Sequence, residues 1–263
     1  MPAVPDALEE SGLPVGRMPL AHWHMQHGAR FDEINLWQVP AVYTDENSEV
    51  AAARTGLAIA DISFITKVML RGAGVAELTQ SLMGDSPAGK PGGVAPLTID
   101  KSILACRLHA DQLLLLGSPI GNDKLEQILS TAVQEKDEGA PASLTRWFPS
   151  RRLLKVDVTS SFACFWLLGP HIDELLRQLT HFDITTLGVR QPPEQESCAE
   201  TGLVGVPATL VRPSIPALPS MRVLVGWDVA EYVWEELFRA GQARKISPLG
   251  MDGLDVLLNQ NIK

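Results

Sequence analysis

One succession of elements occurs twice in this sequence: two β-rich runs joined by a short turn, then a glycine, then a Leu-rich helical segment. The first copy leads through IADIS and KVMLRG to residues 74–83, and the second leads through residues 153–158 and 163–168 to residues 172–180. Strands that come in pairs between helices favour an α+β fold with antiparallel sheets over a doubly wound parallel sheet. The repetition indicates two similar α+β layers.

The other elements follow from hydrophobic periodicity and from turn residues. A helix is expected at 46–55, with Asn47 or Ser48 as its cap. Residues 97–108 and 112–117 are expected to form a hairpin of buried strands. The remaining expectations are a short helix at 20–26, a loop at 84–96, an amphipathic helix at 124–133, a polar loop at 191–201, strands at 204–211 and 222–226, and a helix at 229–240.

Charge and hydropathy limit which partners the chain is expected to bind and in which cellular compartment it is expected to lie. The 263-residue chain carries 22 basic and 31 acidic residues, a formal charge of −9, so a phosphate backbone is an unfavourable partner and no nucleic acid is expected. No apolar run approaches the roughly 20 residues that cross a bilayer. The start, MPAVPDALEESG, lacks the basic and apolar regions of a secretory signal. These features predict a cytoplasmic protein with no membrane partner.

The cysteines and their neighbours do not indicate a disulfide, a zinc site or a nucleophile. Cys106, Cys164 and Cys198 are widely spaced and form no Cys-x-x-Cys pair, so reduced, buried thiols are expected. Ser160 and Ser161 precede Cys164, but no histidine motif supports them and Cys164 lies in an apolar run. Core packing is therefore favoured over nucleophilic catalysis.

Two further sequence features, a cluster of histidines and a glycine-rich segment, could be either ligand sites or ordinary structural features. His22, His24 and His27 could ligate zinc or copper, but no regular spacing brings all three to one face. Structural or surface histidines are favoured, and no metal is predicted. The GKPGG segment at 89–93 has the composition of a phosphate-binding loop without its Gly-Lys-Ser/Thr order, so a flexible loop is favoured.

Motifs along most of the chain resemble those of one family in their order. Those in the first quarter are Pro19, Leu20, Gly28, Ala29, Trp37, Pro40 and Tyr43, then Arg54, Gly56, Asp61, Ser63 and Lys67. Later ones are Arg107-Leu108, Leu168-Gly169-Pro170, Trp234, and Pro248, Leu249, Gly250 and Asp255. In this order they resemble the glycine-cleavage T-protein family, the folate-dependent aminomethyltransferases and their folate-binding relatives.

The resemblance implies a fold, a cofactor and a domain division. It implies two interlocked antiparallel-sheet domains with flanking helices and a pocket for tetrahydrofolate, with Trp37, Tyr43 and Arg212 as contacts. Residues 1–18 are expected to be a disordered lead-in. The first domain is expected to be discontinuous, at 19–63 and 150–263, and the second to span 64–149. The family's C-terminal barrel is absent from the sequence, so a protein partner is expected to close the pocket.

Departures from the family pattern point away from ordinary transfer chemistry. An acidic pair helps position and activate the folate amine in the enzymes, and Lys101 and Ser102 occupy those places here. A cation supplies neither the general base nor the negative charge of a carboxylate. Asp100 would replace the pair only if the strand register slipped by one residue. In the second pterin-contacting region, residues 212–222, only Arg212 matches.

Two hypotheses of function remain. In the first, the chain is a folate-binding one-carbon protein that resembles an aminomethyltransferase with weak or lost activity. In the second, it is a non-catalytic subunit or assembly module of a larger complex, such as a folate-linked oxidase, that keeps the fold without the reaction.

Overall fold

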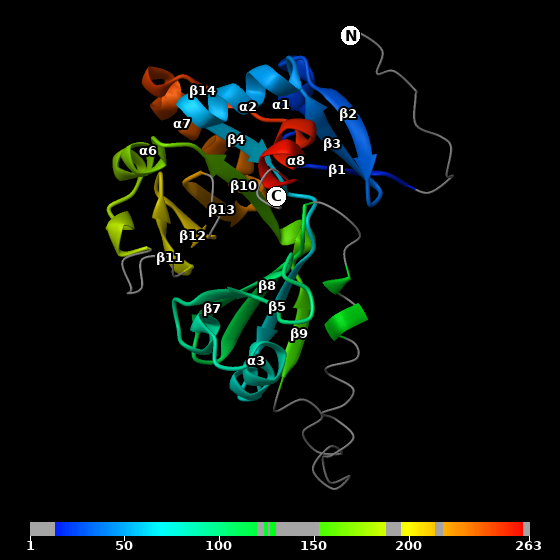
Figure 1. Cartoon of the computed structure of the whole chain (residues 1–263), viewed down its shortest axis with the longest axis vertical. Coiled ribbons are helices and arrows are strands. Elements are labelled where there is room, and N and C mark those ends of the chain that lie inside the picture. Colours follow the sequence, from blue (N-terminus) through cyan, green and yellow to red (C-terminus); the bar gives the residue numbers. More distant parts are fainter. Residues whose placement is uncertain are drawn as a thin grey trace, which may run out of the picture.

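The computed structural model describes residues 14–119, 124–125, 127–129, 153–187, 196–213 and 218–259. Over these residues the chain forms a six-stranded sheet of order β11-β12-β13-β10-β4-β14, a five-stranded sheet of order β6-β7-β8-β5-β9, and a three-stranded sheet of order β1-β3-β2 (Figure 1). Neighbouring strands are antiparallel except in the pairs β1–β3 and β14–β4. The predicted α+β class with mainly antiparallel sheets is confirmed.

The six-stranded sheet is buried on both faces. Its strands are β4 (Leu57–Asp61), β10 (Phe162–Leu168), β11 (Ser197–Leu203), β12 (Val206–Arg212), β13 (Ser220–Gly226) and β14 (Ile246–Pro248). Along β10, Phe165 packs in one cluster with helices α6 (Ile172–Leu179) and α7 (Ala230–Gly241), while Trp166 points to the opposite cluster. Strand alternation therefore gives the sheet two distinct apolar faces.

The five-stranded sheet forms the other lobe in Figure 1. It contains β5 (Lys67–Arg71), β6 (Val94–Pro96), β7 (Leu104–His109), β8 (Gln112–Leu116) and β9 (Leu154–Asp157), with helix α3 (Val75–Met83) packed against it. Backbone hydrogen bonds join it to the six-stranded sheet, from Val94 N to Glu196 O at 3.2 Å and from Cys198 N to Gly92 O at 2.9 Å. The two sheets thus meet along β6 and β11.

The chain crosses between these two sheets twice, and the second crossing shows that one expected pair of strands is wrong. The runs at 153–158 and 163–168 are not partners of each other, because β9 pairs with β5 and β10 pairs with β4 and β13. The short 3-10 turn Thr159–Ser161 carries the chain from one sheet to the other. A polar turn between apolar runs looks the same in sequence whether it closes a hairpin or links two sheets.

The three-stranded sheet and the remaining helices cover the top of the molecule in Figure 1. The strands are β1 (Gly16–Arg17), β2 (Arg30–Ile34) and β3 (Trp37–Val42), and the helices are α1 (Ala21–Gln26), α2 (Glu46–Thr55) and α8 (Met251–Asn259). The expected lead-in at 1–18 is wrong at its end, because β1 pairs with β3 and Met18 is 3% exposed. Residues 1–13 lie outside the described residues.

Other expectations differ from the structure in their details. The α2 helix covers the expected residues, but its cap is Asp45, whose carboxylate accepts from Ser48 N at 3.0 Å. The expected loop at 84–96 contains a 3-10 turn at Pro87–Gly89 and ends in strand β6 at residues 94–96. Residues 97–103 are a turn between β6 and β7 rather than part of a strand. Residues 197–201 belong to β11 rather than to a loop. Of the expected helix at 124–133, residues 125 and 127–129 are helical and most of the rest lies outside the described residues.

The predicted division into two domains remains a proposal. The sheets support placing the return from the second domain at 159–161 rather than at 150, because β9 lies in the five-stranded sheet. No helix within the described part of the chain is long and apolar enough to span a membrane.

Candidate functional site

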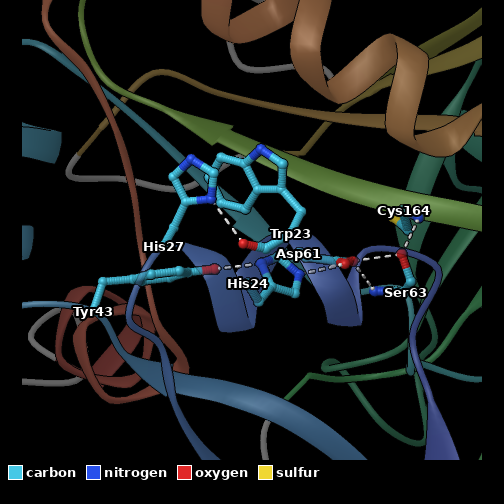
Figure 2. Close-up of polar contacts among 7 residues, drawn as sticks. All are labelled: Trp23, His24, His27, Tyr43, Asp61, Ser63 and Cys164. Atoms are coloured by element: carbon cyan, nitrogen blue, oxygen red, sulfur yellow. Dashed lines mark hydrogen bonds and ion pairs between the residues drawn. The ribbon is translucent and has the colours of Figure 1, made fainter. Parts of the chain in front are cut away.

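A continuous chain of buried hydrogen bonds joins four elements of the larger lobe (Figure 2). The Tyr43 hydroxyl lies 2.7 Å from Nδ1 of His24, and His24 Nε2 lies 3.0 Å from Oδ2 of Asp61. The other carboxylate oxygen, Oδ1, accepts from Ser63 N at 2.9 Å and from Ser63 Oγ at 2.5 Å. The backbone N–H of Cys164 in turn donates to Ser63 Oγ at 3.0 Å.

The protonation pattern of this chain is internally consistent. Each ring nitrogen of His24 has one partner, because Nε2 lies beside the Asp61 carboxylate and Nδ1 beside the Tyr43 hydroxyl. Burial raises the pKa of the Tyr43 phenol well above its usual value, and the carboxylates of Asp61 and Glu49 raise it further. The phenol therefore keeps its proton and donates it.

This Tyr-His-Asp arrangement lies in the interior of the fold and links several of its elements. The side chains of His24 and Asp61 are fully buried, and Ser63 is buried as well. They tie α1, the end of β3, β4 and β10 together. A buried carboxylate is tolerated only when its oxygens are hydrogen-bonded, as both are here. The resemblance motif that contains Asp61 and Ser63 thus has a structural role.

Lys67, the last residue of that motif, is also buried. Its Nζ donates to the carbonyl oxygens of Ser63 at 2.8 Å and Ile65 at 2.9 Å, which fixes the segment that crosses from β4 to β5. Burial lowers the pKa of Lys67 from 10.5 to about 8, against the opposing effects of Cys164, Asp61 and Asp157. The ammonium is held by backbone oxygens where the chain changes sheets.

The positions expected to replace the catalytic acids lie on an exposed turn. Asp100, Lys101 and Ser102 occupy the tip between β6 and β7, and Ile99 beside them is 71% exposed. Asp100 Oδ1 accepts from Ser102 N at 3.0 Å and from Ser102 Oγ at 2.6 Å, and these bonds lower the pKa of Asp100. A solvated carboxylate with a lowered pKa is a poor general base.

The three residues predicted to contact folate have separate surroundings. Trp37 is half-buried, with its ring centroid 6.1 Å from that of Trp227, and packs against the cluster on the α8 side of the six-stranded sheet. Tyr43 packs in the cluster on the α7 side and bonds His24. Arg212 pairs with Asp173 of α6 at 2.5 Å. The described contacts therefore do not bring these three side chains into one site.

The three histidines likewise have separate partners. His24 belongs to the buried chain, His27 donates from Nδ1 to the carbonyl oxygen of Trp23 at 2.7 Å and stacks on its ring, and His22 lies 2.8 Å from Nε2 of Gln26. Among the residues that the structure describes, no group of three or more His, Cys, Asp or Glu side chains has the geometry of a metal site.

The glycine-rich and cysteine candidates are packing features. A Cβ on Gly93 would lie 1.8 Å from the carbonyl oxygen of Pro87, so the GKPGG segment needs glycine for close backbone approach. Burial raises the pKa of the Cys164 thiol to about 11, which keeps it protonated and unreactive. Ser160 and Ser161 are exposed in the turn before β10.

A cavity of about 260 Å³ lies between the two large sheets. Most of its walls are apolar, and polar groups come from Glu200, Thr201 and Thr209; the apolar residues are Met69, Leu108, Leu114, Phe162, Pro207, Ala208 and Leu224. Glu200 Oε2 lies 2.7 Å from Nε2 of His109. The residues predicted from the sequence as contacts do not line this cavity.

Two buried charged residues were missed by sequence reasoning. Glu49 is 3% exposed, and its carboxylate accepts from the backbone N–H groups of Tyr43, Thr44 and Gly250 at 2.7 to 2.9 Å. Arg222 is also 3% exposed, with its guanidinium carbon 4.3 Å from the centroid of the Trp166 ring. The signal for Arg222 was an arginine inside an otherwise apolar strand, which predicts a specific partner.

Comparison with known proteins agrees with this architecture. A probable aminomethyltransferase of Thermococcus gammatolerans is 23% identical over 92% of this chain and 63% of its own length, and the aminomethyltransferase of Geobacillus kaustophilus is 27% identical over 92% and 63%. The chain thus spans less than two thirds of the length of these curated relatives.

Two solved structures share the fold. The glycine cleavage system aminomethyltransferase T from Bartonella henselae matches with a TM-score of 0.68 and 15% identity, over 92% of this chain and 62% of that one. A chain of the heterotetrameric sarcosine oxidase from Corynebacterium sp. U-96 matches with a TM-score of 0.57 and 18% identity, over 88% of this chain and 97% of that one.

The sequence comparison extends over almost the whole of the described fold. The family model described as "GCVT N-terminal domain" matches residues 20–259, which include all three sheets except β1 and every helix of the described residues. This chain therefore belongs to the GCVT N-terminal domain family.

Proposed function

We propose that this chain keeps the aminomethyltransferase fold without the transfer reaction and acts as a non-catalytic subunit or assembly module of a larger complex. The observation that carries the proposal is the exposed turn at 100–102. Lys101 and Ser102 stand where the acidic pair is expected, and the carboxylate of Asp100 is already bonded to Ser102. A site without a positioned base lacks the proton acceptor that the transfer needs.

A similarity of fold supports the proposal of a subunit role. The chain shares its fold with one chain of a heterotetrameric sarcosine oxidase, at a TM-score of 0.57. In that protein the fold is one part of a multi-chain enzyme. We propose the same kind of arrangement here, with a protein partner that closes the pocket side of the fold.

The test is purification of the tagged full chain from its host under mild conditions, with native mass spectrometry of the product. We expect a fixed stoichiometric complex with at least one other chain. A protein that purifies alone and transfers aminomethyl groups to tetrahydrofolate would contradict the proposal.

A double variant tests whether only the acidic pair is missing or whether the rest of the catalytic site is missing as well. Lys101→Asp with Ser102→Asp restores the expected acidic pair, and we expect no transfer activity because the turn is solvated. The double variant Lys90→Asp with Ser86→Asp, in the preceding loop, is the matched control. Activity that appears only in the first variant would mean that the rest of a catalytic site is intact.

A second candidate, favoured by family membership, is tetrahydrofolate binding in a one-carbon role without turnover. Trp37, Tyr43 and Arg212 remain the proposed contacts, although each has the structural partner described above. Calorimetric titration with tetrahydrofolate decides this candidate, with Trp37→Leu as the variant and Tyr232→Leu, at an exposed position of α7, as its control. No binding at millimolar tetrahydrofolate would reject it.

A further inference from the structure

The cavity between the two large sheets lies away from two positions that the family resemblance connects with folate. On the five-stranded sheet, the exposed turn at 100–102 precedes the start of β7 at Leu104, whereas Leu108, four residues further along that strand, lines the cavity. Four residues of strand span about 13 Å. On the six-stranded sheet, Thr209 lines the cavity and Arg212 lies three residues beyond it in β12, about 10 Å along the strand. The cavity is therefore separate from both positions.

Cross-strand rows of side chains form two walls of this cavity. Glu200, Thr209 and Leu224 are opposite one another in the ladder of β11, β12 and β13, so they lie on the same face of the six-stranded sheet. Met69 of β5 and Leu114 of β8 form a corresponding pair in the five-stranded sheet. All five residues line the cavity. One wall therefore carries a carboxylate and a hydroxyl, and the wall on the other sheet is apolar.

The charge of the cavity lining is negative. Glu200 is the only charged residue among the described residues that line the cavity, so no basic side chain there would bind an acid. Glu200 Oε2 lies 2.7 Å from Nε2 of His109, whereas Oε1 accepts no hydrogen bond from another described residue. The Glu200 side chain is 46% exposed, so a ligand from solvent can reach the carboxylate. The cavity is thus suited to a cation rather than to an anion.

We infer that this cavity binds a small primary amine whose ammonium group donates to Oε1 of Glu200 and whose apolar body lies between Leu224 and Leu114. An ammonium has three donors, so it can donate to the Thr209 hydroxyl as well as to the carboxylate. Hydrogen bonds between charged groups are stronger than neutral ones. The cavity volume of about 260 Å³ suits a body of one ring rather than a ligand of drug size. The inference depends neither on tetrahydrofolate binding nor on the proposed subunit role.

The test is calorimetric titration of the full chain with benzylamine at neutral pH, with no folate present. Benzyl alcohol keeps the ring without the charge and methylamine keeps the charge without the ring, so each should bind roughly 5-fold or more weakly than benzylamine. Glu200→Gln should weaken benzylamine binding by roughly 5-fold or more, because a neutral amide replaces the carboxylate at a half-exposed position. Glu231→Gln, at an exposed position of α7, is the matched control and should leave benzylamine binding unchanged.

A second pair of variants tests the apolar wall. Met69→Phe should weaken benzylamine binding by roughly 5-fold or more, because the added ring takes volume from the ligand. Met25→Phe, at an exposed position of α1, should leave it unchanged. Neither Glu200 nor Met69 is fully buried, so both variants are expected to fold, which thermal unfolding checks. No benzylamine binding at millimolar concentration, equal binding of benzyl alcohol or methylamine, or undiminished binding by Glu200→Gln or Met69→Phe would each overturn the inference.

Discussion

Replacement of Lys67 by methionine is expected to change how the free energy of unfolding depends on pH. The Lys67 side chain is fully buried and its Nζ donates to two backbone carbonyl oxygens. Its pKa is lowered by burial from 10.5 to about 8. Methionine has a similar length and no charge, so the variant fills the same space without a titrating group.

The sign follows from proton binding in the two states. Between about pH 8 and 10.5 the unfolded chain binds a proton at Lys67 that the folded chain does not bind, so the stability of the wild type rises with pH in this window. At about 1.4 kcal/mol for each pKa unit, the rise amounts to about 3 kcal/mol. This stability is fully present above pH 10.5 and is lost as the pH falls through about 8.

The assay is urea unfolding of wild type and Lys67→Met at several values between about pH 7 and 10.5. The loss of hydrogen bonds to the carbonyls of Ser63 and Ile65, ~1–3 kcal/mol for each acceptor left unpaired, displaces the whole difference curve without changing its shape. Raised pKa values at Tyr43 and Cys164 act in both proteins, so they largely cancel in the difference.

The difference in the free energy of unfolding, wild type minus variant, should therefore increase by about 3 kcal/mol over this range. Lys101→Met removes an exposed lysine and should give a flat difference curve. A change of less than ~1 kcal/mol for Lys67→Met would refute the reasoning that burial holds this lysine near its point of titration.

Three further substitutions test the structure. Asp61→Ala should lower the free energy of unfolding by roughly 3–5 kcal/mol, because it leaves buried donors unpaired. Urea unfolding at neutral pH measures this change, and a loss below ~1 kcal/mol would contradict a buried hydrogen-bond network. Gly93→Ala should lower the Tm by several degrees, since its Cβ would lie 1.8 Å from a carbonyl oxygen, whereas Gly89→Ala, with open space around its Cβ, should change it little. Asp100→Asn should change stability by less than ~0.5 kcal/mol and leave partner binding intact in a pull-down; loss of the partner would place this turn in the interface.

Local patterns were sufficient for most individual elements. The bounds of α2 agree with the expectation for 46–55, and α3 and α6 are within one or two residues of theirs. Helical periodicity and capping are properties of a few consecutive residues, so the sequence carries them directly. The cap of α2 was placed wrongly because Asp45, Asn47 and Ser48 are all good cap residues and only the backbone conformation selects one.

The candidate site could be predicted only in part. The order of motifs led to the right family, which the match over 20–259 bears out. The motif did not reveal that Asp61 bonds His24, 37 residues earlier, or that Tyr43 completes the chain. Hydrogen-bond partners distant in sequence depend on how sheets and helices pack, and a single sequence does not encode them as a local pattern.

The sequence by itself determined most of the helices and strands, the α+β class and the family of this protein, because periodicity, turn residues and motif order are carried by neighbouring residues. Only the tertiary structure decided that β9 and β10 belong to different sheets and that residues 100–102 lie on an exposed turn. It also decided that Arg222 is buried with unused donors. These features arise where segments far apart in the chain come together, so their energetics depend on burial and on partners that no local pattern specifies.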